Sequence, residues 1–307
     1  MTSHRSLAGV RVLVTGARGF LAAPLRAQLV RAGAELHALS RMPPAETDGA
    51  RWWQGVCDDG ETARRLFAEI RPELVYHLAG DVGAAPDAAR VLPTFQSLLA
   101  STVHALGAAL EVGCQRVVLA ASLTEPDDAR TSPTPGSPYA AAKWAASGYG
   151  RMFQALYGLE VISVRPFMAY GPGQAPSKLV PSVIHALCAG AAPRLSSGRS
   201  EADWVFVDDV VDGLLSAGTA SYPGPASIDL GSGRLISIRE VVETIRGLLG
   251  TEIAPLYGAL PDRPFERPRV ADLADARQRL GWEPCVDLRD GLARTIEALR
   301  KSGEPRL

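Results

Sequence analysis

The fold is decided by the stretch VRVLVTGARGFLAA, Val10 to Ala23. Valine and leucine dominate Val10 to Val14, which predicts a buried strand. Gly16 and Gly19 then stand in the turn before a helix predicted from about Phe20 to Ala32. Gly16 permits a tight turn, and Gly19 lets backbone N–H groups approach a pyrophosphate at the positive end of that helix. The stretch therefore predicts a dinucleotide site at the start of the chain.

The rest of the first half alternates short apolar strands with amphipathic helices. Predicted strands cover 35–39, 74–78, 116–120 and 161–165, and predicted helices cover 61–70, 94–112 and 137–157. Because the strands are nearly continuous apolar runs, helices should cover both faces, as in parallel sheets. We therefore expect an α/β fold with a doubly wound parallel sheet in residues 1–170, which returns at 205–230. Shorter elements separated by Gly and Pro predict a second, smaller α/β domain, mainly residues 171–307.

Composition narrows the classes of partner. The chain of 307 residues carries 32 basic and 33 acidic side chains and a net charge of −1, so no long-range field favours nucleic acid or an anionic membrane. No apolar run is long enough to span a bilayer, and Met1 to Leu7 lacks the core of a signal peptide. The four cysteines stand far apart, which indicates neither a metal site nor disulfides. We expect a cytoplasmic protein that binds a small molecule, with no nucleic acid, membrane or metal partner.

The end of the second predicted strand bears on the choice of dinucleotide. An acidic residue there would bind the ribose of NAD, but the chain has Ser40 and Arg41 instead. Arg18 in the glycine turn is a second guanidinium, and the three residues together would clamp a 2′-phosphate. This favours NADP(H). The alternative is that Arg41 is a solvated loop charge that stacks on adenine.

Three side chains form a candidate catalytic set. Tyr139 and Lys143 are spaced i,i+4 on the predicted helix 137–157, which puts both on one face. An ammonium and a nicotinamide cation beside the phenol would favour phenolate and bring the pKa of Tyr139 toward neutrality, while Lys143 also holds the nicotinamide ribose. Ser122 follows a predicted strand at the carboxyl end of the sheet, where its hydroxyl can bind the reacting oxygen of a substrate.

These features in order resemble the extended short-chain dehydrogenase/reductase family, the NAD(P)-dependent sugar epimerase/dehydratase group. The resemblance rests on TGARGF, YHLAG (Tyr76–Gly80), Ser122, Tyr139-x-x-x-Lys143 and RPFMAYGPGQ (Arg165–Gln174). It implies a Rossmann domain, a C-terminal substrate domain, and often a homodimer through a four-helix bundle of helices 94–112 and 137–157. Cofactor contacts are expected at Gly16, Arg18, Gly19, Phe20, Leu21, Ser40, Arg41, Val56, Asp58, Leu78, Ala79, Gly80, Ala120, Tyr139, Lys143 and Pro166.

The residues after Ser122 separate the reactions of the family. In the 4,6-dehydratases these are Asp and Glu, and the nucleotide-sugar decarboxylases place Glu two residues after the catalytic hydroxyl. This chain has Leu123 and Thr124, so elimination of water and decarboxylation lack a second acid/base. Ser-x-Thr is similar to the 4-epimerases, although a one-residue shift of the loop would bring Glu125 into the site.

The resemblance therefore implies an NAD(P)-dependent nucleotide-sugar epimerase of the 4-epimerase kind. One alternative is an NADPH-dependent ketoreductase that acts on a nucleotide-linked keto-sugar or a non-sugar ketone, and Ser40 and Arg41 favour it. A second alternative is a catalytically silent cofactor-sensing module, against which the intact Ser122, Tyr139 and Lys143 argue.

The expected substrate is a nucleotide-activated sugar, but its anchoring departs from the family pattern. Ala202 stands where an arginine usually grips the diphosphate, and Met168 stands where asparagine is usual. The segment after the catalytic loop is Glu125-Pro126-Asp127 instead of Val-Tyr-Gly. Arg263 matches the other family arginine for the phosphates. The candidate substrate residues are Thr124, Met168, Lys178 and Arg263.

Overall fold

The structure, a computed structural model, describes residues 4–44, 48–83, 85–126, 134–221, 224, 227–262 and 268–301. It consists of two compact units. Unit 1 comprises Met1–Pro166, Val211–Asp229 and Ala274–Trp282, and unit 2 comprises Phe167–Val210, Leu230–Leu273 and Glu283–Leu307. Each unit is therefore assembled from three separate segments of the chain.

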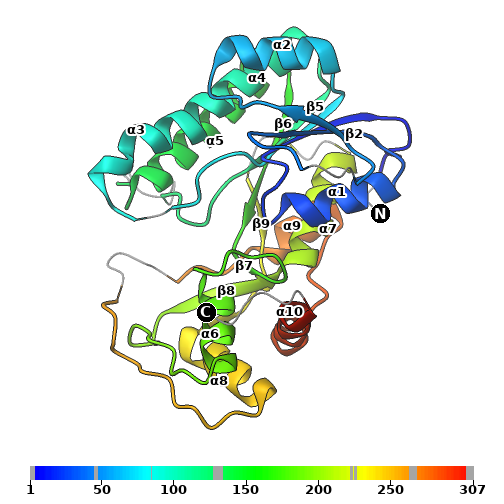
Figure 1. Cartoon of the computed structure of the whole chain (residues 1–307). Coiled ribbons are helices and arrows are strands. Elements are labelled where there is room, and N and C mark those ends of the chain that lie inside the picture. The colour runs from blue at the N-terminus through cyan, green and yellow to red at the C-terminus, as the bar shows by residue number, and fades with distance from the viewer. Residues whose placement is uncertain are drawn as a thin grey trace. The chain divides into compact units, whose positions relative to one another are not determined.

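Unit 1 is built on a seven-stranded sheet in the order β3-β2-β1-β4-β5-β6-β9 (Figure 1). The strands are β1 (Arg11–Thr15), β2 (Glu35–Ser40), β3 (Arg51–Gln54), β4 (Leu74–His77), β5 (Arg116–Ala120), β6 (Glu160–Pro166) and β9 (Ile228–Leu230). The pairings from β3 through to β6 are all parallel, and Val12, Leu13 and Val14 in the centre of the sheet have no exposed surface. The predicted Rossmann-type parallel sheet is confirmed.

Helices cover both faces of this sheet, as Figure 1 shows, with α2, α4 and α5 on one face and α1, α7 and α9 on the other. Their bounds are α1 (Ala22–Arg31), α2 (Gly60–Ile70), η1 (Ala88–Arg90), α3 (Val91–Thr94), η2 (Phe95–Ala100), α4 (Ser101–Glu111), α5 (Pro138–Tyr157), α7 (Val207–Thr219) and α9 (Leu273–Leu280). A buried cluster that includes Phe67, Leu106, Val117 and Phe153 fills the layer between the sheet and α2, α4 and α5.

Helix α5 carries two of the candidate catalytic residues, and its ends are specified locally. Ser137 precedes it, and the Ser137 hydroxyl accepts a hydrogen bond from the N–H of Ala140 at 3.1 Å. Pro138 occupies the first turn, where its missing N–H costs nothing. Gly158 ends the helix with a φ of +73°, a conformation that favours glycine.

A buried arginine joins distant segments of unit 1. Arg116 begins β5, and its Nη1 donates hydrogen bonds to the carbonyl oxygens of Ala217, Gly218 and Ala220 at 3.1, 3.2 and 2.7 Å. Its Nη2 also forms an ion pair with Glu160 at 2.7 Å. The segment that returns to unit 1 after residue 210 is thus bound to the central strands by backbone carbonyl groups.

Unit 2 contains a three-stranded sheet in the order β10-β8-β7, where β7 is Met168–Tyr170, β8 is Glu201–Phe206 and β10 is Leu235–Ser237. Its helices are α6 (Leu179–Cys188), α8 (Ile238–Leu249) and α10 (Leu288–Lys301). The buried carboxylate of Asp203 accepts hydrogen bonds from the backbone N–H groups of Ser232, Gly233 and Ala271. These bonds fix two loops to β8.

Some short elements were not predicted from the sequence. Strands β3, β7 and β10 have three or four residues each, and none is a continuous buried run. Helix α9 is mostly polar and buries Ala276 and Leu280, and its Arg279 donates to the carbonyl oxygen of Gly224 in unit 1. The sequence expectation placed this segment in the second domain. In the described part of the chain, no helix combines the length and the apolar character that a membrane span requires.

Candidate active site

The carboxyl ends of the parallel strands of unit 1 meet at one edge of the sheet, called the carboxyl edge below, where sheets of this kind bind ligands. The residues predicted to contact the dinucleotide lie on or just after the last residues of these strands. They are Gly16, Arg18, Gly19, Phe20 and Leu21 after β1, Ser40 and Arg41 at β2, Val56 and Asp58 after β3, Leu78, Ala79 and Gly80 after β4, Ala120 on β5 and Pro166 on β6. Tyr139 and Lys143 come from α5.

The glycine turn packs tightly against the end of β4. Gly16 has a φ of +65°, and a Cβ atom there would lie 2.7 Å from the Cα of Ala79. The hydroxyl of Thr15 accepts a hydrogen bond from the Ala79 N–H at 3.3 Å. No side chain caps the start of α1, so the first turn of the helix is available to an anion. These features fit the pyrophosphate of a dinucleotide.

The residues predicted to bind a 2′-phosphate lie close together at the end of β2. Nη1 of Arg18 donates to the carbonyl oxygen of Met42 at 3.0 Å, and the Ser40 hydroxyl donates to the same oxygen at 3.3 Å. Arg41 lies between Ser40 and Met42 in sequence, and its side chain is exposed. The two guanidinium groups are therefore on loops that touch each other at the carboxyl edge.

The three candidate catalytic residues are brought together. Ser122 lies in the segment 121–126 after β5, called the Ser122 loop below, and its hydroxyl is close enough to Tyr139 to lower the pKa of that phenol. The Ser122 hydroxyl also lies 2.9 Å from the hydroxyl oxygen of Thr124. Nζ of Lys143 donates to the carbonyl oxygen of Ala120, the last residue of β5, at 2.7 Å. A phenol, a hydroxyl and an amine thus converge between β5 and α5.

Burial dominates the pKa values of this set. It raises the pKa of Tyr139, whereas the hydrogen bond with Ser122 lowers it and the charge of Glu125 raises it further. Burial lowers the pKa of Lys143 to about 8, against the opposing effect of the Glu125 charge. The sequence predicts a lowered pKa for Tyr139, but the protein's own groups shift it upward because burial disfavours phenolate.

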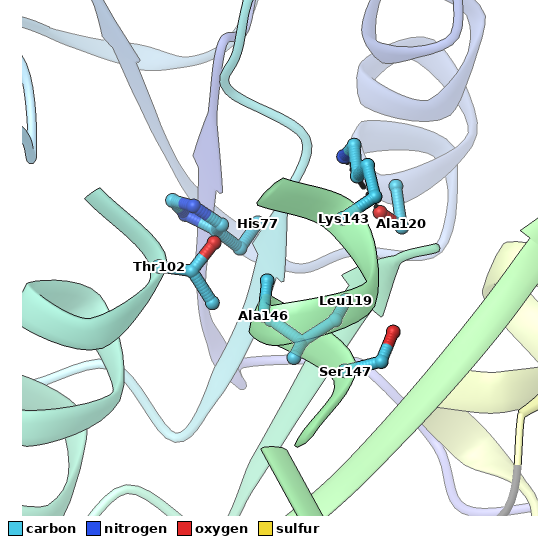
Figure 2. Close-up of a pocket in the computed structure, with 7 residues that line it drawn as sticks. All are labelled: His77, Thr102, Leu119, Ala120, Lys143, Ala146 and Ser147. Carbon is cyan, nitrogen blue, oxygen red and sulfur yellow. Dashed lines mark hydrogen bonds between the residues drawn. The ribbon is translucent and has the colours of Figure 1, made fainter. Parts of the chain in front are cut away.

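A small cavity lies beside Lys143 (Figure 2). Its lining residues come from β4, α4, β5 and α5, and they are His77, Thr102, Leu119, Ala120, Lys143, Ala146 and Ser147. The centre of a water molecule could move within a volume of about 10 Å³ in this cavity, so the cavity is about large enough for one water molecule. The polar side chains that line it, His77, Thr102, Lys143 and Ser147, come from three elements, β4, α4 and α5.

His77 is a residue to which sequence reasoning assigns no chemistry. It is 3% exposed, its Nδ1 lies 2.9 Å from the hydroxyl oxygen of Thr15, and its buried Nε2 has no hydrogen-bond partner in the described structure. Burial, and then the charge of Lys143, lowers its pKa to about 3, so the imidazole is neutral. Its place at the end of β4, on the same edge as Ser122, is the signal that could have identified it.

Glu125 is the residue that a one-residue shift of the loop would bring into the site, and the sequence assigns it no other role. Glu125 belongs to the Ser122 loop, and its side chain is buried. Its Oε1 accepts a hydrogen bond from the Ser122 N–H at 2.7 Å, and its Oε2 accepts one from the Ser147 hydroxyl at 3.0 Å. The carboxylate thus contacts both elements that carry the catalytic set.

The candidate substrate residues do not all lie in unit 1 with the candidate catalytic residues. Thr124 lies in the Ser122 loop, whereas Met168 on β7 and Lys178 just before α6 belong to unit 2, and Lys178 is exposed. Arg263 lies outside the described residues. Among the residues that are described, no group of His, Cys, Asp or Glu side chains could hold a metal ion.

Comparisons with known proteins point to one family. Residues 12–231 match the NAD dependent epimerase/dehydratase family. A UDP-glucose 4-epimerase of Mycolicibacterium smegmatis is 32% identical over 96% of this chain and 100% of its own length. A dTDP-glucose 4,6-dehydratase of Neisseria gonorrhoeae is 31% identical over 79% of this chain and 78% of its own length.

The solved structures agree. A UDP-glucose 4-epimerase of Thermotoga maritima, determined with UDP-glucose, superimposes with a TM-score of 0.86 at 25% identity, over 95% of this chain and 99% of that one. MoeE5, in complex with UDP-glucose and NAD, gives a TM-score of 0.85 at 30% identity over the same shares. The chain therefore belongs to the NAD dependent epimerase/dehydratase family and is an enzyme of the extended short-chain dehydrogenase/reductase group.

Proposed function

We propose that this enzyme is an NAD(P)-dependent nucleotide-sugar 4-epimerase. The observation that carries the proposal is the meeting of Ser122, Tyr139 and Lys143 at the carboxyl edge, where the described residues place no carboxylate as a second acid/base. Glu125 does not supply one, because its oxygens accept hydrogen bonds from the Ser122 N–H and the Ser147 hydroxyl. Similarity to UDP-glucose 4-epimerases over nearly the whole chain supports the same reaction.

In the proposed reaction, each of the three candidate catalytic residues has a separate role. Tyr139 transfers the proton of a sugar hydroxyl, and Ser122, whose hydroxyl lies near Tyr139, binds the reacting oxygen. Lys143 holds the ribose and stabilises phenolate. When bound, the nicotinamide takes up and returns hydride, and its positive charge lowers the pKa of the phenol. Hydride would return to the carbon from which it was removed, so the reaction has no net oxidation. The configuration at that carbon inverts because the keto-sugar turns over in the site before hydride returns to its other face.

A ketoreductase is the second candidate, and the arrangement at the end of β2 favours it. Arg18 and Ser40 both donate hydrogen bonds to the Met42 carbonyl oxygen, so a guanidinium lies at the end of β2, which supports binding of a 2′-phosphate there. NADPH is the usual donor for such enzymes. The anchoring of a nucleotide sugar by Met168, Lys178 and Arg263 remains a proposal for either reaction.

One experiment separates the two. The purified protein is denatured, and any released dinucleotide is identified by chromatography, while the native protein is incubated with UDP-glucose or UDP-galactose and followed by ¹H NMR of the anomeric protons. We expect retained NAD⁺ or NADP⁺ and interconversion of the two sugars. An empty protein that consumes added NADPH with a ketone, and leaves both sugars unchanged, would establish the reductase instead.

The dinucleotide preference gives a separate prediction. We expect NADP⁺ to bind more tightly than NAD⁺, and Arg18→Ala to weaken NADP⁺ binding about tenfold through loss of a charge-assisted hydrogen bond, with little effect on NAD⁺. Calorimetric titration of both dinucleotides measures this. Arg31→Ala, an exposed arginine at the far end of α1, is the matched control. Equal or tighter NAD⁺ binding would refute the preference.

We further propose that the enzyme is a homodimer through α3, η2, α4 and α5. Large exposed apolar side chains gather on these helices, namely Val91, Leu92, Phe95, Leu110, Tyr149, Leu156 and Tyr157. Such patches are typical of protein interfaces. Light scattering of the wild-type protein should give twice the chain mass of 32.5 kDa. Phe95→Glu should reduce the measured mass to that of one chain. Leu256→Glu, at an exposed leucine in unit 2, should leave the measured mass unchanged. A wild-type mass of one chain would contradict the proposal.

A further inference from the structure

Glu125 is buried in the active site, yet the proposed reaction does not use it. The side chain is 5% exposed, and its hydrogen bonds join the Ser122 N–H at 2.7 Å to the Ser147 hydroxyl at 3.0 Å. Ser147 itself is 3% exposed. Burying a carboxylate costs free energy unless hydrogen bonds and an opposite charge compensate. A cation near the Glu125 carboxylate would supply such a charge.

One such cation is Lys143, whose charged form Glu125 stabilises. Tyr139, Lys143 and Ser147 follow one another at intervals of four residues on α5, so their side chains lie on one face, with neighbouring Cβ atoms about 5–6 Å apart. Because Oε2 of Glu125 is bonded to Ser147, the carboxylate lies over the face that carries the Lys143 amine. Ser147 and Lys143 also line the same cavity (Figure 2).

The charged and titratable groups around this lysine come from three elements. Glu125 acts on it from the Ser122 loop and stabilises its charged form. His77 faces it from β4, but that imidazole is neutral, with a pKa lowered to about 3. Tyr139 lies one turn before it on α5. Glu125 is thus the acidic group, among the described residues, whose charge opposes the burial of the ammonium.

We propose that Glu125 is a positioning residue that ties the Ser122 loop to α5 and supplies the negative charge opposite Lys143. Its catalytic consequence rests on the proposed function, since Ser122 and Lys143 act there on the sugar and the ribose. The pairing of charges does not depend on any substrate. Glu125 then determines both the position of the Ser122 hydroxyl and the protonation of the Lys143 amine.

The proposal has a signature that a purely structural role lacks. Glu125→Gln keeps an acceptor for the Ser122 N–H, reverses the direction of the hydrogen bond with the Ser147 hydroxyl, and removes the charge. Loss of a negative charge favours the deprotonated forms of both Lys143 and Tyr139. Both groups should therefore lose their protons at lower pH in this variant.

The chain allows the lysine to be observed directly, because its lysines are only Lys143, Lys178 and Lys301. In the protein labelled with ¹³Cε-lysine, we expect one signal to titrate near pH 8 and to disappear in Lys143→Met. Glu125→Gln should move that midpoint down by about 1 pH unit, as expected for losing a nearby opposite charge. Glu125→Asp, which keeps the charge, should leave it near the wild-type value.

Ser147→Ala is the matched control, because it removes one hydrogen bond of the carboxylate and leaves the charge in place. A Glu125→Gln midpoint equal to that of the wild type, or an equal shift in Ser147→Ala, would overturn the proposal. The pH profile of kcat tests the catalytic part, and both of its limbs should move to lower pH in Glu125→Gln. If no sugar nucleotide is epimerised, the proposed function fails, but the lysine titration still decides the role of Glu125.

Discussion

Tyr139→Phe is expected to lower kcat for epimerisation by about 10²- to 10⁴-fold, the usual contribution of a positioned acid/base. The substitution removes the hydroxyl near Ser122 and leaves the half-buried ring in place. Dinucleotide affinity should change little, because Lys143 keeps its hydrogen bond to Ala120. Steady-state kinetics and a binding titration measure the two effects.

Tyr149→Phe is the control for this variant, since Tyr149 is an exposed tyrosine on the same helix. Its kcat should equal that of the wild type. If Tyr139→Phe kept more than about a tenth of the activity, Tyr139 would not be the acid/base, because proton transfer by that group normally contributes far more.

Gly16→Ala is expected to weaken dinucleotide binding about 30-fold, which corresponds to about 2 kcal/mol of backbone strain at the phosphate turn. Two effects add at this position. The φ of +65° disfavours any residue with a Cβ, and that atom would lie 2.7 Å from Ala79 Cα and 2.8 Å from Ala79 N. The turn after β1 must then move away from the end of β4. Calorimetry with NAD⁺ and NADP⁺, together with the thermal midpoint, measures the change.

Gly107→Ala provides the contrast. Gly107 lies within α4, and a Cβ there would meet no atom within 4 Å. Alanine is the better helix former, so this variant should be at least as stable as the wild type and bind the dinucleotide equally. Wild-type affinity in Gly16→Ala would show that the turn is not the pyrophosphate site.

The sequence predicted those parts of the site that depend on periodicity. A buried strand followed by Gly16 specified the first turn, and the spacing of Tyr139 and Lys143 on a helix specified their common face. The meeting of Ser122 with Tyr139 followed from the parallel topology. These features depend on short-range geometry and on which end of a strand a residue occupies.

The parts that escaped prediction depend on where loops place their side chains. Glu125 follows Ser122 by three residues, and no periodicity states whether its carboxylate faces solvent or the interior. His77 is polar in a buried strand, and its contacts with Thr15 and the Lys143 cavity arise only when β4 lies between β1 and β5. The effect of burial on the Tyr139 pKa also escaped prediction, because desolvation depends on packing in three dimensions.

The segmented make-up of unit 1 has a consequence during biosynthesis. Arg116 needs the carbonyl groups of residues 217–220, and the last segment of the unit ends at Trp282. A ribosome must therefore translate the chain through residue 282 before unit 1 can close, so a nascent chain stopped at residue 166 would expose an unfinished sheet to chaperones.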